Sequence, residues 1–230
     1  MMAQDHKNKG GLRVLRAADR AWAPSRSGRH LLAGLFGTPE RVARCGQPIE
    51  SAPSGEILVE TKRLILRRHG PVDHPVYFNM YADPRMARFA GRAPAGPDEA
   101  WTRLLRQTGH WSLFGYGFLA IEEKATGCFV GEAGLAHFRR GLGTEFDSVP
   151  EAGWAIAPWA QGHGYATEAA AAALQWTEAR FGMRRTVCLI HSGNASSLRV
   201  AEKLGYTPMG ECTYRGYHAI TFERGAAVMV

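Results

Sequence analysis

Hydrophobic and polar positions change their spacing several times after residue 56, and each change predicts a different element. Short runs of apolar and β-branched residues predict strands at 61–67, 117–122, 128–135, 151–157, 186–190, 209–214 and 217–222. Longer stretches with helical spacing predict helices at 71–80, 97–113, 164–181 and 194–204. Strands and helices in this order indicate a mixed α/β (α+β) layer and not a regular β-α-β alternation.

Turn residues mark several of these boundaries. Pro84 disfavours a helical residue before it, so the first helix should end near Asp83. Pro97, followed by two acidic residues, suits the first turn of the second helix. The polar, glycine-containing segment 123–127 predicts that the strands on either side of it form an antiparallel hairpin.

Residues 1–55 differ from the rest of the chain. Seven arginines between Arg13 and Arg44 are scattered among Gly, Ser, Pro and Ala, without a sustained hydrophobic period. The sequence therefore predicts a basic, flexible N-terminal extension at 1–55 and one folded domain at 56–230. A targeting leader or an over-long gene start would have the same composition, and the sequence leaves these alternatives open.

Net charge at first suggests nucleic acid as a partner, since the chain of 230 residues carries a formal charge of +7. Residues 1–55 hold nine Lys or Arg and four Asp or Glu, a net of +5, which leaves +2 for residues 56–230. No basic stripe interleaved with aromatic residues is visible. The charge pattern therefore argues against nucleic acid as a partner of the folded domain.

Other residue types exclude further classes of function. The four cysteines form no C-x-x-C pair and the nine histidines do not cluster at metal-ligand spacing, so no metal site is expected. No apolar stretch approaches the roughly 18 residues of a membrane helix. We expect a cytoplasmic protein without a membrane partner, and a homodimer stays open as its assembly.

The segment 158–168 carries the most informative chemistry. A predicted strand ends there and turns through Gly162 and Gly164 into a long helix. Such a turn can point successive backbone N–H groups into one concavity, to which the helix N-terminus adds roughly half a positive charge. The small residue Ala166 leaves room for phosphate oxygens at the first turn. An ordinary helix entry is the alternative, but the arrangement suits a diphosphate.

This segment resembles a signature of the GNAT acyltransferase superfamily. Gln161 to Ala166 fits its acetyl-coenzyme A pattern, Q/R-x-x-G-x-G/A. The stretch 194–206 is similar to that family's N-x-x-S-x-x-V-x-E-K-x-G-F/Y helix, and 61–67 is similar to its T-x-R-L-x-L-R opening. Together they resemble the branch of ribosomal-protein alanine N-acetyltransferases over residues 56 to 224. The resemblance implies a mixed, mostly antiparallel sheet of about seven strands flanked by about four helices.

The resemblance also implies which residues contact the cosubstrate, acetyl-CoA. The fourth and fifth strands should splay apart, which leaves backbone groups of the fourth for the pantetheine arm and the thioester carbonyl. The pyrophosphate should lie on the glycine turn, and Asn194 and Ser197 should face the pantetheine end. The implied binding residues are Trp154, Ala155, Ile156, Ala157, Gln161, Gly162, His163, Gly164, Tyr165, Ala166, Asn194 and Ser197.

Catalytic candidates follow from the need to handle protons. An ammonium has no lone pair, so a base must take a proton from the acceptor amine. Glu151 is the candidate, because Glu151 to Trp154 resembles an E-x-G-Y/W pattern of this branch. Many members protonate the leaving thiolate with a Tyr, but the aligned residue here is Ala201, so Ser197 or solvent must serve.

We therefore expect an acyltransferase that moves an acetyl group from acetyl-CoA to a primary amine by direct attack in a ternary complex. A protein N-terminus and a small molecule both stay open as its acceptor, because residues 70–116, which should form the acceptor side, carry no diagnostic motif. His110, Trp111 and Tyr116 could line the acceptor pocket or belong to the core. The competing hypothesis is a catalytically silent acyl-CoA-binding regulatory module, with which Ala201 is consistent but against which Glu151, Asn194 and Ser197 argue.

Overall fold

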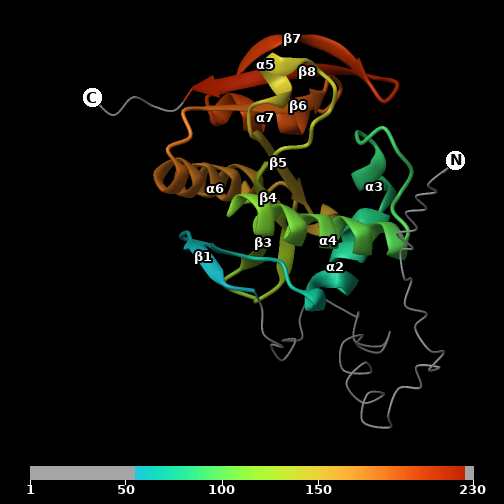
Figure 1. Ribbon diagram of the computed structural model, residues 1–230. Helices are drawn as coiled ribbons and strands as arrows, with labels where there is room; N and C mark the ends of the chain where they lie inside the picture. Colours follow the sequence, from blue (N-terminus) through green and yellow to red (C-terminus); the bar gives the residue numbers. More distant parts are fainter. Residues whose placement is uncertain (1–54, 226–230) are drawn as a thin grey trace, which may run out of the picture. The chain divides into compact units, whose positions relative to one another are not determined.

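The computed structural model describes residues 55–225, which form one mixed sheet flanked by helices (Figure 1). The sheet has eight strands in the order β1-β2-β3-β4-β5-β6-β8-β7. The strands are β1 (Ile57–Glu60), β2 (Leu64–Arg67), β3 (Phe118–Glu123), β4 (Phe129–Ala136), β5 (Glu151–Ile156), β6 (Arg185–His191), β7 (Thr207–Tyr214) and β8 (Tyr217–Gly225). The extension predicted at 1–55 lies outside the described residues except for Gly55, so it stays a prediction.

Helices cover the sheet at the positions that the periodicity predicts. The four expected helices are α2 (His74–Ala82), α4 (Pro97–Phe114), α6 (Tyr165–Phe181) and α7 (Ala195–Lys203). Two helices of four residues, α3 (Pro84–Ala87) and α5 (Thr144–Asp147), were not expected, because one turn is too short to show a hydrophobic period. None of the helices within 55–225 is long and apolar enough to cross a membrane.

The first predicted strand, 61–67, is shorter in the structure, where it is β2. The eighth strand is β1, which precedes it and was not predicted. The backbone leaves the sheet at Thr61, whose N–H donates to the Leu64 carbonyl at 2.9 Å, and re-enters it as β2. The Thr61 hydroxyl oxygen accepts a 2.9 Å hydrogen bond from the Leu64 N–H. This tight turn separates β2 from β1, which pairs back on it antiparallel.

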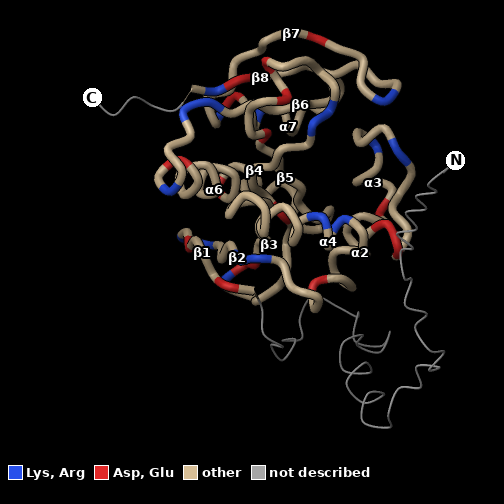
Figure 2. The backbone as a smooth tube through the Cα atoms, in the orientation of Figure 1, with Lys and Arg blue, Asp and Glu red and all other residues tan. Residues whose placement is uncertain are grey.

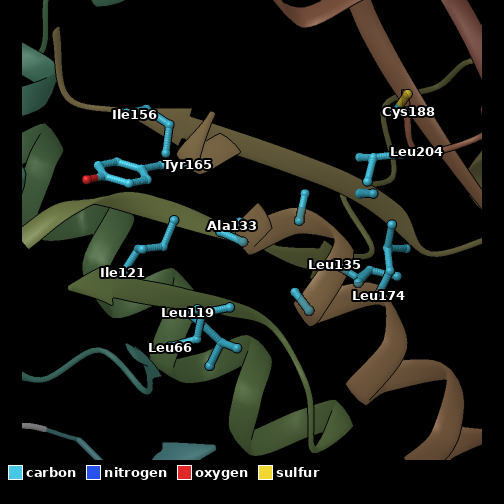
Figure 3. Close-up of a cluster of buried hydrophobic side chains, with 14 of the residues drawn as sticks. Leu66, Leu119, Ile121, Ala133, Leu135, Ile156, Tyr165, Leu174, Cys188 and Leu204 are labelled. Carbon is cyan, nitrogen blue, oxygen red and sulfur yellow. The ribbon is translucent and has the colours of Figure 1, made fainter. Parts of the chain in front are cut away.

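Two hydrophobic clusters stabilise the domain. The larger one joins α6 and α7 to the sheet, with Leu66, Leu119 and Ile121 from β2 and β3 and Leu174 from α6 among its members (Figure 3). Fully buried alanines on α6, such as Ala169, let the helix approach the sheet closely. The smaller cluster lies under α2 and α4 and includes Tyr77, Tyr81 and Ala100. Burial of one such large side chain contributes about 1.5–3 kcal/mol.

The sheet opens between β5 and β6. All other neighbouring strands pair antiparallel, whereas these two are parallel and share one pair of partners, Glu151 and Val187. From Ala152 to Ile156, β5 pairs with β4 but not with β6. The expected splay is therefore present, and it leaves one backbone edge of β5 without a sheet partner beyond Glu151.

Candidate active site

A cavity of about 830 Å³ begins at this splay and has two chemically different walls. We name the wall built by β5, the N-terminus of α6 and α7 the turn half. Its lining residues are Trp154, Ala155, Ile156, Ala160, Gln161, Gly162, Gly164, Tyr165, Ala166, Thr167, Asn194, Ser196, Ser197, Arg199, Val200 and Lys203. The remaining lining residues form the arginine half: Tyr81, Arg85, Met86, Phe89, Ala90, Arg92, Glu99, Thr102, Arg103, Arg106, Phe138, Arg140, Tyr214, Arg215 and Tyr217.

The glycine turn forms the centre of the turn half. Gly162 and Gly164 have φ angles of 85° and 79°, which favour glycine, and α6 starts at the next residue, Tyr165. A Cβ at Gly162 would meet no atom within 4 Å, so the space above this backbone is open. Backbone N–H groups and the positive end of the α6 dipole therefore face a space that suits a phosphate group.

The segment 61–63 holds this turn in place. The Glu168 carboxylate, in the first turn of α6, accepts hydrogen bonds from the Thr61 hydroxyl at 2.6 Å and from Arg63 Nε at 2.7 Å. Arg63 also donates to the His163 carbonyl at 2.9 Å. Burial alone would raise the pKa of Glu168, but the bonds from Thr61 and Arg63 lower it, so the carboxylate stays charged. In the sequence, 61–67 matched a family pattern, but this match did not predict that Thr61 and Arg63 hold the glycine turn in place.

The other two elements of the turn half contribute backbone and small polar groups. Trp154, Ala155 and Ile156 line the cavity on β5, next to the strand edge that lacks a partner. On α7, the Asn194 side-chain oxygen accepts the Ser197 N–H at 3.1 Å and so caps the helix. Both residues line the cavity, and the structure brings them to the same wall as the glycine turn.

Three of the positions singled out in the sequence lie close to the turn half in the chain but do not line the cavity. The His163 ring stacks on Tyr165, with 5.6 Å between the ring centroids. Ala157 is buried in the smaller cluster, and Ala201 is fully buried in the larger one. Gln161 does line it, with its side-chain amide hydrogen-bonded to the Ile156 carbonyl at 2.9 Å. The glycine turn therefore presents mainly backbone to the cavity.

Glu151 lies at the start of β5, behind the arginine half. Its two carboxylate oxygens accept hydrogen bonds from Arg140 Nε and Nη2, both at 2.6 Å, and Arg140 also donates to the Tyr214 hydroxyl at 3.1 Å. Burial raises the pKa of Glu151, although the Arg140 guanidinium opposes this shift. Arg140 and Tyr214 line the cavity but Glu151 does not. The carboxylate is thus adjacent to the cavity wall and bound to it through Arg140.

A buried polar network supports the arginine half from below. Arg103 lies 4.1 Å from the Tyr81 ring centroid and 3.9 Å from the Glu132 carboxylate, to which the Tyr81 hydroxyl donates. Nearby, Arg67 binds both oxygens of Asp73 at 2.6 and 2.8 Å. Charged groups at these depths need such partners, because an unpaired buried charge is costly.

The arginine half was not foreseen in the sequence. Its arginines come from α3, the α3–α4 loop, α4, the β4–α5 loop and the β7–β8 turn (Figure 2). His110, Trp111 and Tyr116 do not line it: the Trp111 indole donates to the Phe118 carbonyl at 2.8 Å inside the core. Residues 55–225 contain no group of three or more His, Cys, Asp or Glu that could hold a metal ion.

Comparisons with known proteins show which family this chain matches. A family model described as "Acetyltransferase (GNAT) domain" matches residues 63–207. YkkB, an uncharacterized protein of Bacillus subtilis (strain 168), is 38% identical over 110 residues, which are 44% of this chain and 60% of YkkB. The match therefore spans less than two thirds of that relative's length.

Solved structures show the same arrangement of elements. A GnaT-family acetyltransferase from Bordetella pertussis is 35% identical with a TM-score of 0.66, and the match covers 73% of this chain and 98% of that one. RimL, a ribosomal L7/L12 alpha-N-protein acetyltransferase solved in complex with coenzyme A, is 16% identical with a TM-score of 0.60, covering 74% and 98%. At that identity the likeness to RimL shows the fold alone.

Proposed function

Because this chain belongs to the GNAT acetyltransferase family, we propose that it transfers an acetyl group from acetyl-CoA to a primary amine by direct attack in a ternary complex. The observation that carries this proposal is the single cavity that joins the glycine turn, the open edge of β5 and the arginine half. One wall suits the cosubstrate, and the other leaves room for an acceptor. Both substrates can therefore meet without a covalent enzyme intermediate.

In this proposal the turn half holds acetyl-CoA. Backbone groups from Gly162 to Ala166 bind the pyrophosphate at the α6 N-terminus, where anions are stabilised. The free edge of β5 at 154–156 binds the pantetheine arm, with Asn194 and Ser197 beside it. A backbone N–H of this edge polarises the thioester carbonyl and stabilises the oxyanion that develops there.

The chemical step requires two proton transfers. The amine lone pair attacks the thioester carbonyl carbon, the C–S bond breaks, and the amine loses a proton while the thiolate gains one. Glu151 is the proposed base, because burial raises its pKa and so makes the carboxylate a stronger proton acceptor. Ser197, in the cavity wall, is the proposed donor toward the thiolate. The chain has no tyrosine at the position that many members use for this purpose, since Ala201 occupies it.

The experiment that tests the proposal measures release of free CoA thiol from acetyl-CoA by the full chain with a panel of primary amines. Amine-dependent release supports transfer, and peptides compared with small amines would identify the acceptor class. The buried Ala201 favours the second candidate, a silent acyl-CoA-binding module. Tight binding of acetyl-CoA without thiol release for any amine would establish that module and contradict the transferase.

A further inference from the structure

The arginine half, where the proposed function places the acceptor, carries an excess of positive charge. Eight Lys or Arg side chains line the whole cavity, whereas Glu99 is its single lining carboxylate. Six of the eight cations, all arginines, belong to the arginine half. A cavity with one sign of charge raises the local concentration of ligands of the opposite sign.

Four of the cations are compensated by carboxylates. Arg92 pairs with Glu99, Arg85 with Asp83 and Arg140 with Glu151, at N–O distances of 2.5–2.6 Å. Arg103 lies 3.9 Å from Glu132. These pairs fix the positions of the guanidinium groups but leave little net charge.

The other four cations have no carboxylate partner within residues 55–225: Arg106, Arg199, Lys203 and Arg215. Arg199 and Lys203 lie on α7 in the turn half, the wall that the proposed function assigns to acetyl-CoA. Arg106 on α4 and Arg215 in the β7–β8 turn belong to the arginine half. Two unpaired charges therefore remain for the acceptor.

The β7–β8 turn is fixed against the segment that follows α3. A Cβ on Gly91 would meet the Tyr217 ring at 2.5 Å and the Arg215 carbonyl at 3.4 Å, so the two segments are in close contact. Arg215 itself has a φ of 50°, where non-glycine residues are uncommon. Its guanidinium lies over the Tyr214 ring, 5.4 Å from the centroid. An arginine is thus held at the cavity at a position whose backbone favours glycine or asparagine.

We infer that the acceptor is an amine that carries a carboxylate or phosphate near its amino group, which Arg106 and Arg215 bind. This inference rests on the proposed transferase function and specifies its substrate class. Guanidinium groups bind these anions with paired hydrogen bonds. A polyamine such as spermidine would place further positive charge beside unpaired arginines and should be a poor acceptor.

The same positive charge assists the chemistry. Nearby cations disfavour the ammonium form of the bound amine and so lower its pKa. The nucleophilic neutral amine is then present in a larger fraction at neutral pH. The anion of the acceptor supplies the attraction that the amine itself lacks.

The test compares amines in pairs that differ by the anion and keep the amino group. Suitable pairs are glucosamine 6-phosphate with glucosamine, L-asparagine with L-asparaginamide, and a peptide starting Asp-Asp with one starting Asn-Asn; spermidine is the cationic comparison. We expect kcat/KM for thiol release to be about tenfold higher for the anionic member of at least one pair. The pair with the largest ratio separates a small acceptor from a peptide. Neutral members equal to or better than anionic ones in all pairs, or spermidine as the best acceptor, would overturn the inference.

Variants separate this role from binding of acetyl-CoA. In Arg106→Gln and Arg215→Gln, kcat/KM should become about equal for the anionic and neutral members of a pair. KM for acetyl-CoA should stay within about twofold of the wild-type value. Arg180→Gln, an exposed arginine on α6 outside the cavity, is the matched control and should leave both values unchanged. A raised KM for acetyl-CoA with an unchanged anionic preference would assign these arginines to the cosubstrate and contradict the inference.

A binding measurement distinguishes failure of the inference from failure of the proposed function. If no amine supports thiol release, the transferase proposal fails, but the charge preference can still be measured by calorimetry with CoA present. N-acetylaspartate should then bind at least about tenfold more tightly than the neutral N-acetylasparaginamide. Equal affinities would contradict the anionic acceptor.

Discussion

The two halves of the cavity are built in different ways. The turn half consists largely of backbone: two glycines with positive φ, the start of a helix and an unpaired strand edge. The arginine half consists of long charged side chains from segments far apart in the sequence, held by buried carboxylates and aromatic rings. The first half suits a ligand that is common to a family, whereas the second can change its specificity through a few side chains.

The largest expected effect concerns the buried ion pair below the arginine half. Asp73→Asn removes one partner of buried Arg67 and should lower the free energy of unfolding by about 3–5 kcal/mol. Urea unfolding at pH 7 measures it. Asp98→Asn, at an exposed site in the first turn of α4, is the control and should cost no more than about 1 kcal/mol. An equal loss of unfolding free energy in both variants would mean that the Arg67–Asp73 pair does not stabilise the arginine half.

The same variant gives a pH dependence with a definite sign. Burial alone would raise the pKa of Asp73, but the bonds from Arg67 and His69 lower it well below its usual value. A lowered folded-state pKa contributes stability above the unfolded value of about 3.9, and this contribution is lost as the pH falls toward the folded-state value. The difference between wild type and Asp73→Asn should therefore shrink below about pH 4. A constant difference down to pH 2 would contradict the assigned shift.

Glu151→Gln tests whether this carboxylate acts as a base or as an anchor for Arg140. Loss of the base should lower kcat by about 10²–10⁴-fold and remove the acidic limb of the pH profile, because wild-type activity falls as Glu151 is protonated. Loss of the anchor would instead raise KM for the acceptor and retain that limb. Arg140→Lys, which keeps the charge but loses the paired bonds, serves as comparison. An unchanged rate across pH would remove Glu151 from the mechanism.

Two glycines with open surroundings test the turn half. Gly162→Ala and Gly182→Ala replace glycines with φ of 85° and 63°, and neither Cβ would meet an atom within 4 Å. Both should lose about 1–2 kcal/mol of stability from backbone strain. Gly162→Ala alone should raise KM for acetyl-CoA, by about tenfold, because its methyl group enters the phosphate space. A similar KM for both variants would contradict binding at the turn.

The smallest effect is expected for Ser197→Ala. If the hydroxyl donates a proton to the leaving thiolate, kcat should fall several-fold and the loss should be smaller at low pH, where solvent protonates more easily. The helix cap should persist, because Asn194 bonds the backbone N–H of Ser197 and not its side chain. Full activity of the variant at all pH values would show that the Ser197 hydroxyl does not donate this proton and that the side chain serves only in packing.

Local motifs explain why the fold and the turn half were predictable. Glycines at 162 and 164, the helix that follows and the capping Asn194 lie within short segments whose geometry depends on neighbouring residues. The mostly antiparallel sheet and the splay of its fourth and fifth strands followed from the family resemblance. One error arose at 61–67, because the periodicity of Leu64 to Arg67 hides the turn that Thr61 makes with Leu64.

Long-range contacts explain what the sequence could not give. Arg63 meets Glu168 across 105 positions, and Gly91 meets Tyr217 only in the folded chain. Arg106 and Arg215 look like ordinary surface arginines until α4 and the β7–β8 turn face one cavity. Spacing rules describe single elements, so they do not reveal which charges meet across the molecule.

The measurement that tests the account most directly is the initial rate of CoA thiol release as acetyl-CoA and an anionic amine are varied together. The account predicts release that requires the amine and double-reciprocal lines that intersect, as expected when both halves of the cavity are filled before reaction. Release that is independent of the amine, or parallel lines from a covalent acetyl-enzyme, would contradict it.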